Sequence, residues 1–250
     1  MEHDGGRPAR TPPPPPAPPA AADVFGSALP TAERFVEHLS STGISWGLVG
    51  PREVPRLWDR HVLNCAVVSD LLSPDARVID IGSGAGLPGL TIALRRPDLR
   101  VLLVEPLLRR ATWLEQIVAD LELGNVTVRR ARAEELHGGE RGDYVTARAV
   151  ASLDRLAGWA LPLLRPGGQL LALKGRSAEE EVARTAAAVE AAGGVATEVV
   201  SVGQGLVDPP VTVVRVTAGS RPLRSTSGSS AASPARRRRR PRPARRPPAG

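Results

Sequence analysis

The chain has 250 residues, 42% of them hydrophobic, which is enough to bury one sizeable core. Its single cysteine, Cys65, excludes an internal disulfide and a metal cluster held by several cysteines. No apolar run approaches the roughly eighteen residues of a membrane span, and the first thirty residues hold prolines where a signal peptide needs an apolar segment. We therefore expect a cytoplasmic protein without a membrane or metal partner.

The formal net charge of +7 originates in the C-terminal segment. Residues 221–250 contain ten Arg and no acid, so the formal charge of residues 1–220 alone is −3. Because a slightly acidic domain gives no overall attraction for phosphates, contacts with nucleic acid must come from local patches or from this tail.

Both ends of the chain have compositions that cannot form a core. Residues 1–22 include the proline run 12–16, and residues 221–250 are rich in Ser, Pro and Arg, so we expect a disordered head and a disordered tail. The tail either adds salt-dependent affinity for RNA or has no selected role. Between them we expect one domain, 23–220, with a helical N-terminal layer at 23–75 and an α/β core at 76–220.

The N-terminal layer is expected to contain two helices. Phe35, Val36 and Leu39 share one face of a helix that ends near Gly43, and apolar residues recur at helical spacing over 53–72. The second stretch carries Arg60 and His61 beside apolar positions. It is either an ordinary surface helix or an element whose polar face overhangs a ligand pocket.

The core begins with a buried strand, 77–81, that runs into a glycine-rich turn. Glycines at 82, 84, 86 and 89 precede the apolar segment 90–94, which predicts a helix ending at Pro97. Glycine lets the backbone approach a ligand closely, and the first turn of the helix offers free N–H groups to it. The stretch therefore predicts a nucleotide-binding turn. A glycine-rich turn that binds no ligand is the alternative for the same sequence.

The spacing of the turn separates two classes of nucleotide cofactor. A dinucleotide fingerprint that starts at Gly82 requires a third glycine at position 87, and this position is Leu87. Asp80, at the end of the strand, would repel a diphosphate and attract a cation. The pattern D-x-G-x-G-x-G resembles motif I of the class I methyltransferases, whose cofactor S-adenosylmethionine carries an ammonium and a sulfonium.

The elements that follow repeat an alternation of strand and helix. We expect strands at 100–104, 126–128, 142–150 and 169–173, helices at 107–123, 153–164 and 177–192, and a closing pair of strands at 197–202 and 211–216. This order predicts an α/β fold built on a doubly wound sheet with one antiparallel strand.

Charged residues near the strand ends are the remaining candidates for a site. Glu105 ends the second strand, where an acid can accept hydrogen bonds from ribose hydroxyls. Arg109 and Arg110 begin the next helix, where they oppose its dipole, so they either contact phosphate or are solvated. Lys174 is the one lysine among 33 basic residues. Either a lysine occurs at this position by chance, or a site at the end of the strand requires a compact ammonium group instead of a guanidinium.

Several motifs together resemble the ribosomal RNA small subunit methyltransferase G family, also called glucose-inhibited division protein B. The matching pieces occur in the family's order over about residues 44–176: Arg60-His61-x-x-Asn64, Asp80-x-Gly82-x-Gly84-x-Gly86-Leu87-Pro88-Gly89, Arg132-x-Glu134-Glu135, Ala147-Arg148-Ala149 with Ser152-Leu153, and Ala172-Leu173-Lys174-Gly175. The chain departs from the family at Asn64-Cys65, which weakens any role assigned to these two positions.

The resemblance implies a class I S-adenosylmethionine-dependent methyltransferase with a Rossmann-like core. It implies transfer of a methyl group to N7 of a guanine in 16S rRNA, with the small ribosomal subunit as partner and, we expect, a monomeric enzyme. Cofactor contacts would come from Asp80, Gly82, Gly84, Leu87, Glu105, Ala133, Glu134 and Arg148. Contacts with RNA would come from Arg60, His61, Arg109 and Lys174, with Arg148 and Lys174 as positioning groups rather than acids or bases.

The chemistry of guanine N7 agrees with the absence of an evident acid–base pair. N7 is a ring nitrogen with an exposed lone pair and no proton to lose, so its methylation requires positioning and electrostatics but no general base. Methylation of carbon 5 of cytosine would need a nucleophilic thiolate, whereas Cys65 lies on an apolar helix face. A small-molecule methyltransferase and a non-enzymatic RNA-binding protein remain the alternatives.

Overall fold

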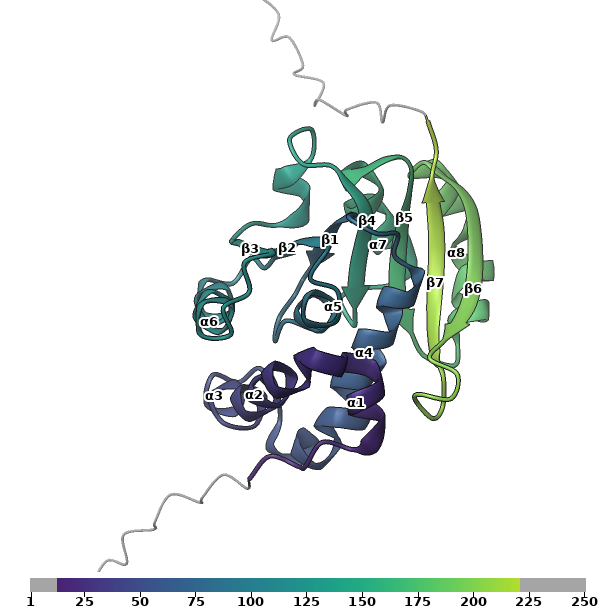
Figure 1. Cartoon of the computed structure of the whole chain (residues 1–250). Coiled ribbons are helices and arrows are strands. Elements are labelled where there is room, and N and C mark those ends of the chain that lie inside the picture. Colours follow the sequence, from purple (N-terminus) through teal and green to yellow (C-terminus); the bar gives the residue numbers. More distant parts are fainter. Residues whose placement is uncertain (1–12, 221–250) are drawn as a thin grey trace, which may run out of the picture.

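The computed structural model describes residues 13–220 of the chain. A seven-stranded sheet crosses the molecule in the order β3-β2-β1-β4-β5-β7-β6 (Figure 1). Its strands are β1 (Arg77–Ile81), β2 (Arg100–Val104), β3 (Val126–Arg129), β4 (Gly142–Arg148), β5 (Leu164–Lys174), β6 (Gly194–Val202) and β7 (Val211–Ala218). β7 is antiparallel to both of its neighbours, and the other neighbouring pairs are parallel. This is the doubly wound sheet with one antiparallel strand that the sequence predicts.

Helices cover both faces of the sheet. The core helices are α5 (Gly89–Arg95), α6 (Leu108–Asp120), α7 (Leu153–Ala160) and α8 (Ala178–Ala191), with short helices η5 (Ala133–Leu136) and η6 (Leu161–Leu163). α5 and α6 pack on one face together with the N-terminal helices, while α7 and α8 pack on the other (Figure 1). The central strands β1 and β2 are apolar apart from Arg77 and Arg100 at their starts and the buried Asp80, because both of their faces are covered.

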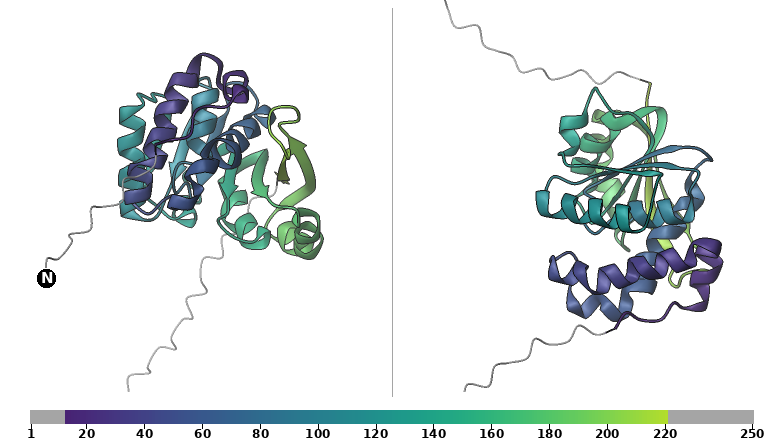
Figure 2. Two further views of the ribbon diagram at one scale, coloured as in Figure 1. Left: turned by 90° about the horizontal axis from the view of Figure 1, so that it is seen from below. Right: turned by 60° about the vertical axis from the view of Figure 1, so that its left-hand side comes forward.

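The N-terminal helices form a further layer below α5 and α6 (Figure 2). This layer consists of α1 (Pro19–Phe25), η1 (Gly26–Ala28), α2 (Leu29–Ser40), α3 (Thr42–Ser45), η2 (Pro51–Arg56), η3 (Leu57–Leu63), α4 (Asn64–Ala66) and η4 (Val67–Leu71). The helical stretch expected over 53–72 is present, but it changes from 3-10 to π to α geometry along its length.

Several element boundaries differ from the sequence-based expectation by up to five residues, and two of these differences have a clear physical reason. The head was expected to extend to residue 22, yet α1 begins at Pro19, where proline pre-sets a helical φ, and Ala21 is fully buried. The indole Nε1–H of Trp58 also donates to the carbonyl of Pro15 at 3.1 Å. Strand β5 begins at Leu164 rather than 169, because residues 165–168 form a bulge inside the strand, with Gly167 at φ +77°. Residues 1–12 and the tail at 221–250 lie outside the described residues.

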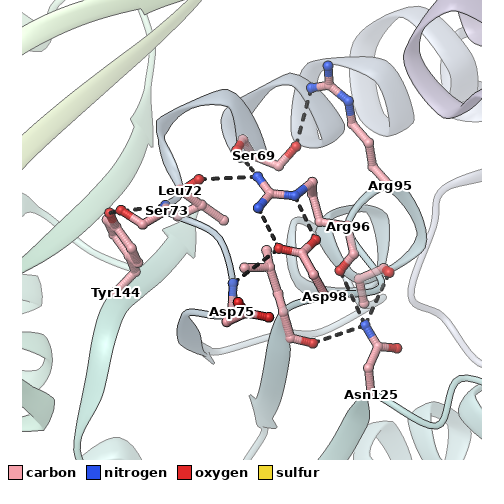
Figure 3. A network of polar contacts seen from close by, with 11 residues as sticks. Ser69, Leu72, Ser73, Asp75, Arg95, Arg96, Asp98, Asn125 and Tyr144 are labelled. Carbon is pink, nitrogen blue, oxygen red and sulfur yellow. Dashed lines mark hydrogen bonds and ion pairs between the residues drawn. The ribbon is translucent and has the colours of Figure 1, made fainter.

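A polar network fixes the N-terminal layer to the core (Figure 3). The guanidinium of Arg96, at the end of α5, binds Asp98 through two nitrogens at 2.8 and 2.6 Å and also donates to the carbonyls of Ser69 and Leu72. Arg95 donates to the hydroxyl of Ser69 at 3.2 Å. These hydrogen bonds hold the C-terminal end of η4 against the end of α5, shortly before β1 begins. Among residues 13–220, no helix is long and apolar enough to cross a membrane.

Candidate functional site

A cleft of about 870 Å³ lies at the carboxyl ends of β1, β2 and β4, under part of the N-terminal layer. The strand order reverses between β1 and β4, and in open α/β sheets ligands bind at such a reversal. The lining comprises Leu48–Gly50, Glu53 and His61 from the N-terminal layer, Gly82–Ala85 and Leu87 from the turn, Glu105–Leu107, Arg110, Arg130–Arg132 and Glu135, and Arg148–Val150 after β4.

The glycine turn forms the floor of the cleft. Gly82, Gly84 and Gly86 have φ values of +65°, +53° and +80°, which side chains rarely adopt. A Cβ at Gly82 would also lie 2.9 Å from Cγ2 of Val150, and one at Gly86 would overlap Leu90. The turn therefore requires glycine for both conformation and space.

Glu105 connects the turn to the end of β2. Its carboxylate is 2% exposed and accepts the N–H of Gly84 at 3.0 Å and the N–H of Leu107 at 3.0 Å. Each oxygen still has lone pairs that can accept from a ligand hydroxyl. The position and chemistry agree with the ribose contact expected from the sequence.

Asp80 lies below the turn and does not line the cleft. The side chain is fully buried, its Oδ1 accepts the hydroxyl of Thr146 at 2.7 Å, and Oδ2 has no hydrogen-bond partner among residues 13–220. Burial is the main cause that raises the pKa of Asp80 to about 6, against the opposing hydrogen bond from Thr146. Direct contact with a cofactor cation, as expected from the sequence, is not available to this carboxylate, which can act on the cleft through its field.

Glu53, His61 and Arg148 form a hydrogen-bonded chain along one wall of the cleft. One guanidinium nitrogen of Arg148 contacts Nδ1 of His61 and the other lies 3.0 Å from Sγ of Cys65. Because Arg has donors only, Nδ1 must accept, so Nε2 carries the proton that it donates to Glu53 at 2.7 Å. Burial, and then the charge of Arg148, lower the pKa of His61, and the hydrogen bond from His61 lowers the pKa of Glu53.

Lys174 and Arg109 lie outside the cleft lining. The ammonium of Lys174 donates to the carbonyl of Ala151 at 3.0 Å and to the carboxylate of Glu181 at 2.9 Å, and both charged side chains are 13% exposed. Arg109 donates to the carbonyl of Ser45 at 2.9 Å and stacks on Trp46. Both side chains make contacts within the chain, Arg109 remains exposed, and the RNA contacts expected of them stay a prediction.

The other predicted residues border the cleft. Arg60 is 59% exposed, with its guanidinium 3.9 Å from Glu53. Ala133 and Glu134 line an adjoining recess of about 130 Å³ that shares Gly82, Arg132 and Val150 with the cleft. The sequence-based site is thus brought together at one place, apart from Asp80, Arg109 and Lys174.

A family model described as rRNA small subunit methyltransferase G matches residues 28–209. The chain belongs to this family. A ribosomal RNA small subunit methyltransferase G of Renibacterium salmoninarum is 57% identical over 201 residues, which cover 80% of this chain and 94% of that protein. Enzymes of the same name from Thermobifida fusca and Streptomyces avermitilis are 56% and 54% identical and are covered over 83% and 85% of their lengths.

A solved O-methyltransferase family protein from Burkholderia thailandensis has the same fold, with a TM-score of 0.50 at 19% identity over 80% of this chain and 68% of that chain. Together with the family match, it confirms the predicted methyltransferase fold. Membership of the family also confirms the enzyme class and S-adenosylmethionine as the cofactor. Among residues 13–220, no group of three or more His, Cys, Asp or Glu could hold a metal ion.

Sequence reasoning missed part of this methyltransferase site. Glu53 appears in the sequence only as the first residue of a helix, and Arg130 and Arg132 received no role although they line the cleft. The signal for the two arginines was available, since they directly follow strand β3 and so lie at the same edge of the sheet as Gly82 and Glu105. Nothing in the sequence indicates that a short 3-10 helix would place Glu53 opposite the turn.

Proposed function

We propose that the protein transfers the methyl group of S-adenosylmethionine to N7 of a guanine in the 16S rRNA of the small ribosomal subunit. The observation that carries this proposal is the cleft at the strand reversal, with a glycine floor, an acid at the end of β2 and an arginine-bearing wall, in a chain of an rRNA methyltransferase family. A monomer in the cytoplasm is part of the proposal, because residues of one chain build the whole cleft.

The residues present fit S-adenosylmethionine. The glycine floor would hold its amino-acid end, since Gly82 and Gly84 line the cleft with no side chain to cover their backbone, and Glu105 would accept from its ribose hydroxyls. Ala133 and Glu134 border the recess next to this position, where the adenine would lie. When bound, the cofactor supplies a methyl group on a sulfonium sulfur, which retains the electron pair of the broken bond.

Arginines on the cleft wall are the groups available for RNA. Arg110, Arg130, Arg132 and Arg148 all line the cleft, and guanidinium groups bind phosphate oxygens and guanine O6. Three of the predicted RNA contacts, Arg60, His61 and Lys174, each pair with a carboxylate within the chain. Arg60 is the most exposed of the three. These contacts would hold the target base, and they replace Arg109 and Lys174 as the proposed phosphate ligands.

The reaction needs no general base from the chain. The lone pair of guanine N7 forms the new bond to carbon, and no proton has to be removed. The chain must instead hold N7 in line with the methyl group and keep water out of the cleft, and such positioning accounts for a large part of the barrier lowering in two-substrate reactions. The hydrogen-bonded state of His61, with both ring nitrogens engaged, is consistent with a holding role rather than proton transfer.

The test is incubation of the full-length protein with labelled S-adenosylmethionine and small ribosomal subunits that lack base methylation, followed by mass mapping of the modified nucleoside. We expect N7-methylguanosine in 16S rRNA. Labelling at another atom or base would contradict the proposal, and cofactor binding without labelled RNA would indicate a small-molecule acceptor.

Two glycine variants give a matched control for this test. Gly82→Ala introduces a Cβ that meets Val150 on the cleft floor, whereas Gly205→Ala has a similar left-handed φ, +78°, with nothing within 4 Å of the new Cβ. We expect G82A to lose cofactor affinity and methylation and G205A to retain both. Equal losses would show that backbone strain alone, and not the cleft, is responsible.

A further inference from the structure

Two carboxylates of the cleft lining have no part in the proposed function, Glu53 and Glu135, and Glu135 accepts the backbone N–H of Arg132 at 3.1 Å. Glu53, in η2, lines the cleft from the N-terminal layer, and its side chain is 33% exposed. Its Oε2 accepts from His61 at 2.7 Å, while Oε1 makes no hydrogen bond within residues 13–220. A carboxylate with one unused acceptor atom therefore lines a cleft that also carries four arginines, Arg110, Arg130, Arg132 and Arg148.

The surroundings hold this carboxylate in one orientation and one charge state. Arg148 fixes the tautomer of His61, so that Nε2–H must point to Glu53. The hydrogen bond from His61 lowers the pKa of Glu53, so the carboxylate is ionised at neutral pH and acts only as an acceptor. Arg148 itself is tied to Cys65 at 3.0 Å, which extends the support to the buried helix.

The shape of guanine relates this acceptor to the reaction. N7 lies on one edge of the purine, and the Watson–Crick edge, with its N1–H and N2–H donors, lies on the opposite side. A base that turns N7 toward the methyl group above the glycine floor must turn N1–H and N2–H toward another wall. Glu53 comes from the N-terminal layer and Gly82 from the core, so the two residues contribute to the cleft from different layers.

We propose that Glu53 selects the target base, its carboxylate accepting the N1–H and N2–H of guanine while His61 and Arg148 hold it in place. Enzymes that act on an unstacked base commonly read its Watson–Crick edge in this way. Adenine lacks the N1–H and presents an acceptor there, which a carboxylate repels. This inference rests on the proposed function and names the residue that makes it specific for guanine.

The same contact favours the chemical step. Formation of the N7–methyl bond places a positive charge on the purine, and an anion on the far edge stabilises that charge as it develops. Loss of the anion should therefore lower kcat as well as the affinity for RNA. A residue that only shapes the cleft would not produce this combined effect.

The experiment compares full-length Glu53→Gln with wild type on unmethylated small subunits. Gln can still accept from His61, but its amide N–H groups then face the N–H groups of guanine. We expect kcat/KM for the RNA to fall about 10- to 100-fold, the range for a lost hydrogen bond to a charged group, with part of the loss in kcat. The dissociation constant for S-adenosylmethionine, measured by calorimetry without RNA, should stay within about twofold.

Glu198→Gln is the matched control. Glu198 is an exposed acid on β6 that pairs with Arg215 on β7 at 2.9 Å, and it does not line the cleft. Its replacement removes the same charge and should leave methylation unchanged. Glu53→Asp keeps the charge but withdraws it by one methylene group, so it should give an intermediate loss and serves as the second variant if E53Q does not fold.

The role of His61 as a positioning residue has its own readout. His61→Phe should lower kcat/KM for the RNA, and adding it to E53Q should cost little more, because both changes disturb the same contact. Independent, additive losses would separate His61 from Glu53.

Two results would overturn the inference. Equal RNA kinetics for E53Q and wild type would remove Glu53 from recognition. A tenfold weaker cofactor affinity with unchanged kcat at saturating cofactor would assign Glu53 to the ammonium of S-adenosylmethionine instead. Absence of N7-methylguanosine with wild type would contradict the proposed function itself, so the two failures are distinguishable.

Discussion

Asp80 is the residue at which burial and charge conflict most directly. Its carboxylate is fully buried below the glycine turn, its Oδ2 lacks a hydrogen bond among residues 13–220, and Glu105 contributes a further negative charge nearby. A buried ionised group without full compensation destabilises the fold. Asp80 nevertheless stands below the position proposed for a cationic cofactor, where a negative charge is useful.

This conflict predicts a pH dependence of stability. With a pKa of about 6 in the fold and 3.8 as the reference, Asp80 binds more protons in the folded than in the unfolded state between these values. The free energy of unfolding should therefore fall as pH rises through this window, by up to about 3 kcal/mol. Urea unfolding of wild type and Asp80→Asn from pH 4 to 7 measures it. The difference between the two proteins should change with pH, and a constant difference would contradict the raised pKa.

At the scale of single residues, the sequence located the cleft better than it assigned contacts. Gly82 and Glu105 directly follow β1 and β2, and Arg148 is the last residue of β4, so the rule that parallel strands end at one edge places all three in the cleft lining. The depth of Asp80 below the turn and the pairing of Lys174 depend on which side chains pack around them. Such contacts between distant parts of the chain have no signature in local spacing.

At the scale of elements, the segment between β4 and α7 closes one side of the cleft. Ala149 has φ +54°, unusual for a residue with a side chain, and Val150 lies against Gly82. Lys174 holds this segment through the carbonyl of Ala151, and Glu181 accepts the N–H of Leu153 at 2.7 Å. A compact ammonium suits two acceptors from different elements, which gives a structural reason for the one lysine of the chain.

Removal of one partner of this largely buried pair, in which each side chain is 13% exposed, should be costly. Lys174→Met leaves the Glu181 carboxylate without its cation, and we expect a loss of about 3–5 kcal/mol in unfolding free energy. Glu181→Gln in the same chain removes the unpaired charge and should recover part of the loss. Chemical denaturation of the single and double variants measures both values.

An exposed ion pair provides the comparison for this prediction. Breaking the Arg215–Glu198 pair, in which Glu198 is 51% exposed, should cost at most about 1 kcal/mol. A K174M protein that keeps its stability yet loses affinity for RNA would instead support the direct RNA contact predicted from the sequence.

The elements themselves were predictable where periodicity was strong. The strands at 100–104 and 126–128 and the helix at 177–192 agree with β2, β3 and α8 within a few residues. The start of β5 was not predictable. The sequence Arg165-Pro166-Gly167-Gly168 is typical of a turn, whereas in the structure it forms a bulge within the strand. The local amino-acid sequence indicates a bend, but the pairing with β4 determines whether the strand continues through that bend.

At the scale of the whole molecule, the cleft depends on two layers that are fixed to one another. The core supplies the glycine floor and the arginines after β3, and the N-terminal layer supplies Glu53 and His61. Arg95 connects the layers by donating to the carbonyls of Val24 and Ala66 at 3.1 and 3.3 Å. In this arrangement the core can form the cofactor site, while the N-terminal layer and the arginines of the cleft form most of the RNA site.

The distribution of charge over the whole chain leads to a prediction about the tail. The part up to residue 220 has a formal charge of −3, whereas the complete chain has +7, so the arginines of 221–250 dominate any long-range attraction to RNA. Deletion of 221–250 should weaken binding to small subunits at low salt and flatten the dependence of affinity on salt concentration, because fewer counterions are released. Cofactor affinity and the methylated atom should not change, since the cleft lies within residues 48–150. Filter binding over a salt series, together with mass mapping of the product, tests both expectations. An unchanged dependence of affinity on salt would show that the tail has no role in RNA affinity. A different methylated base would show that the tail takes part in selecting the target.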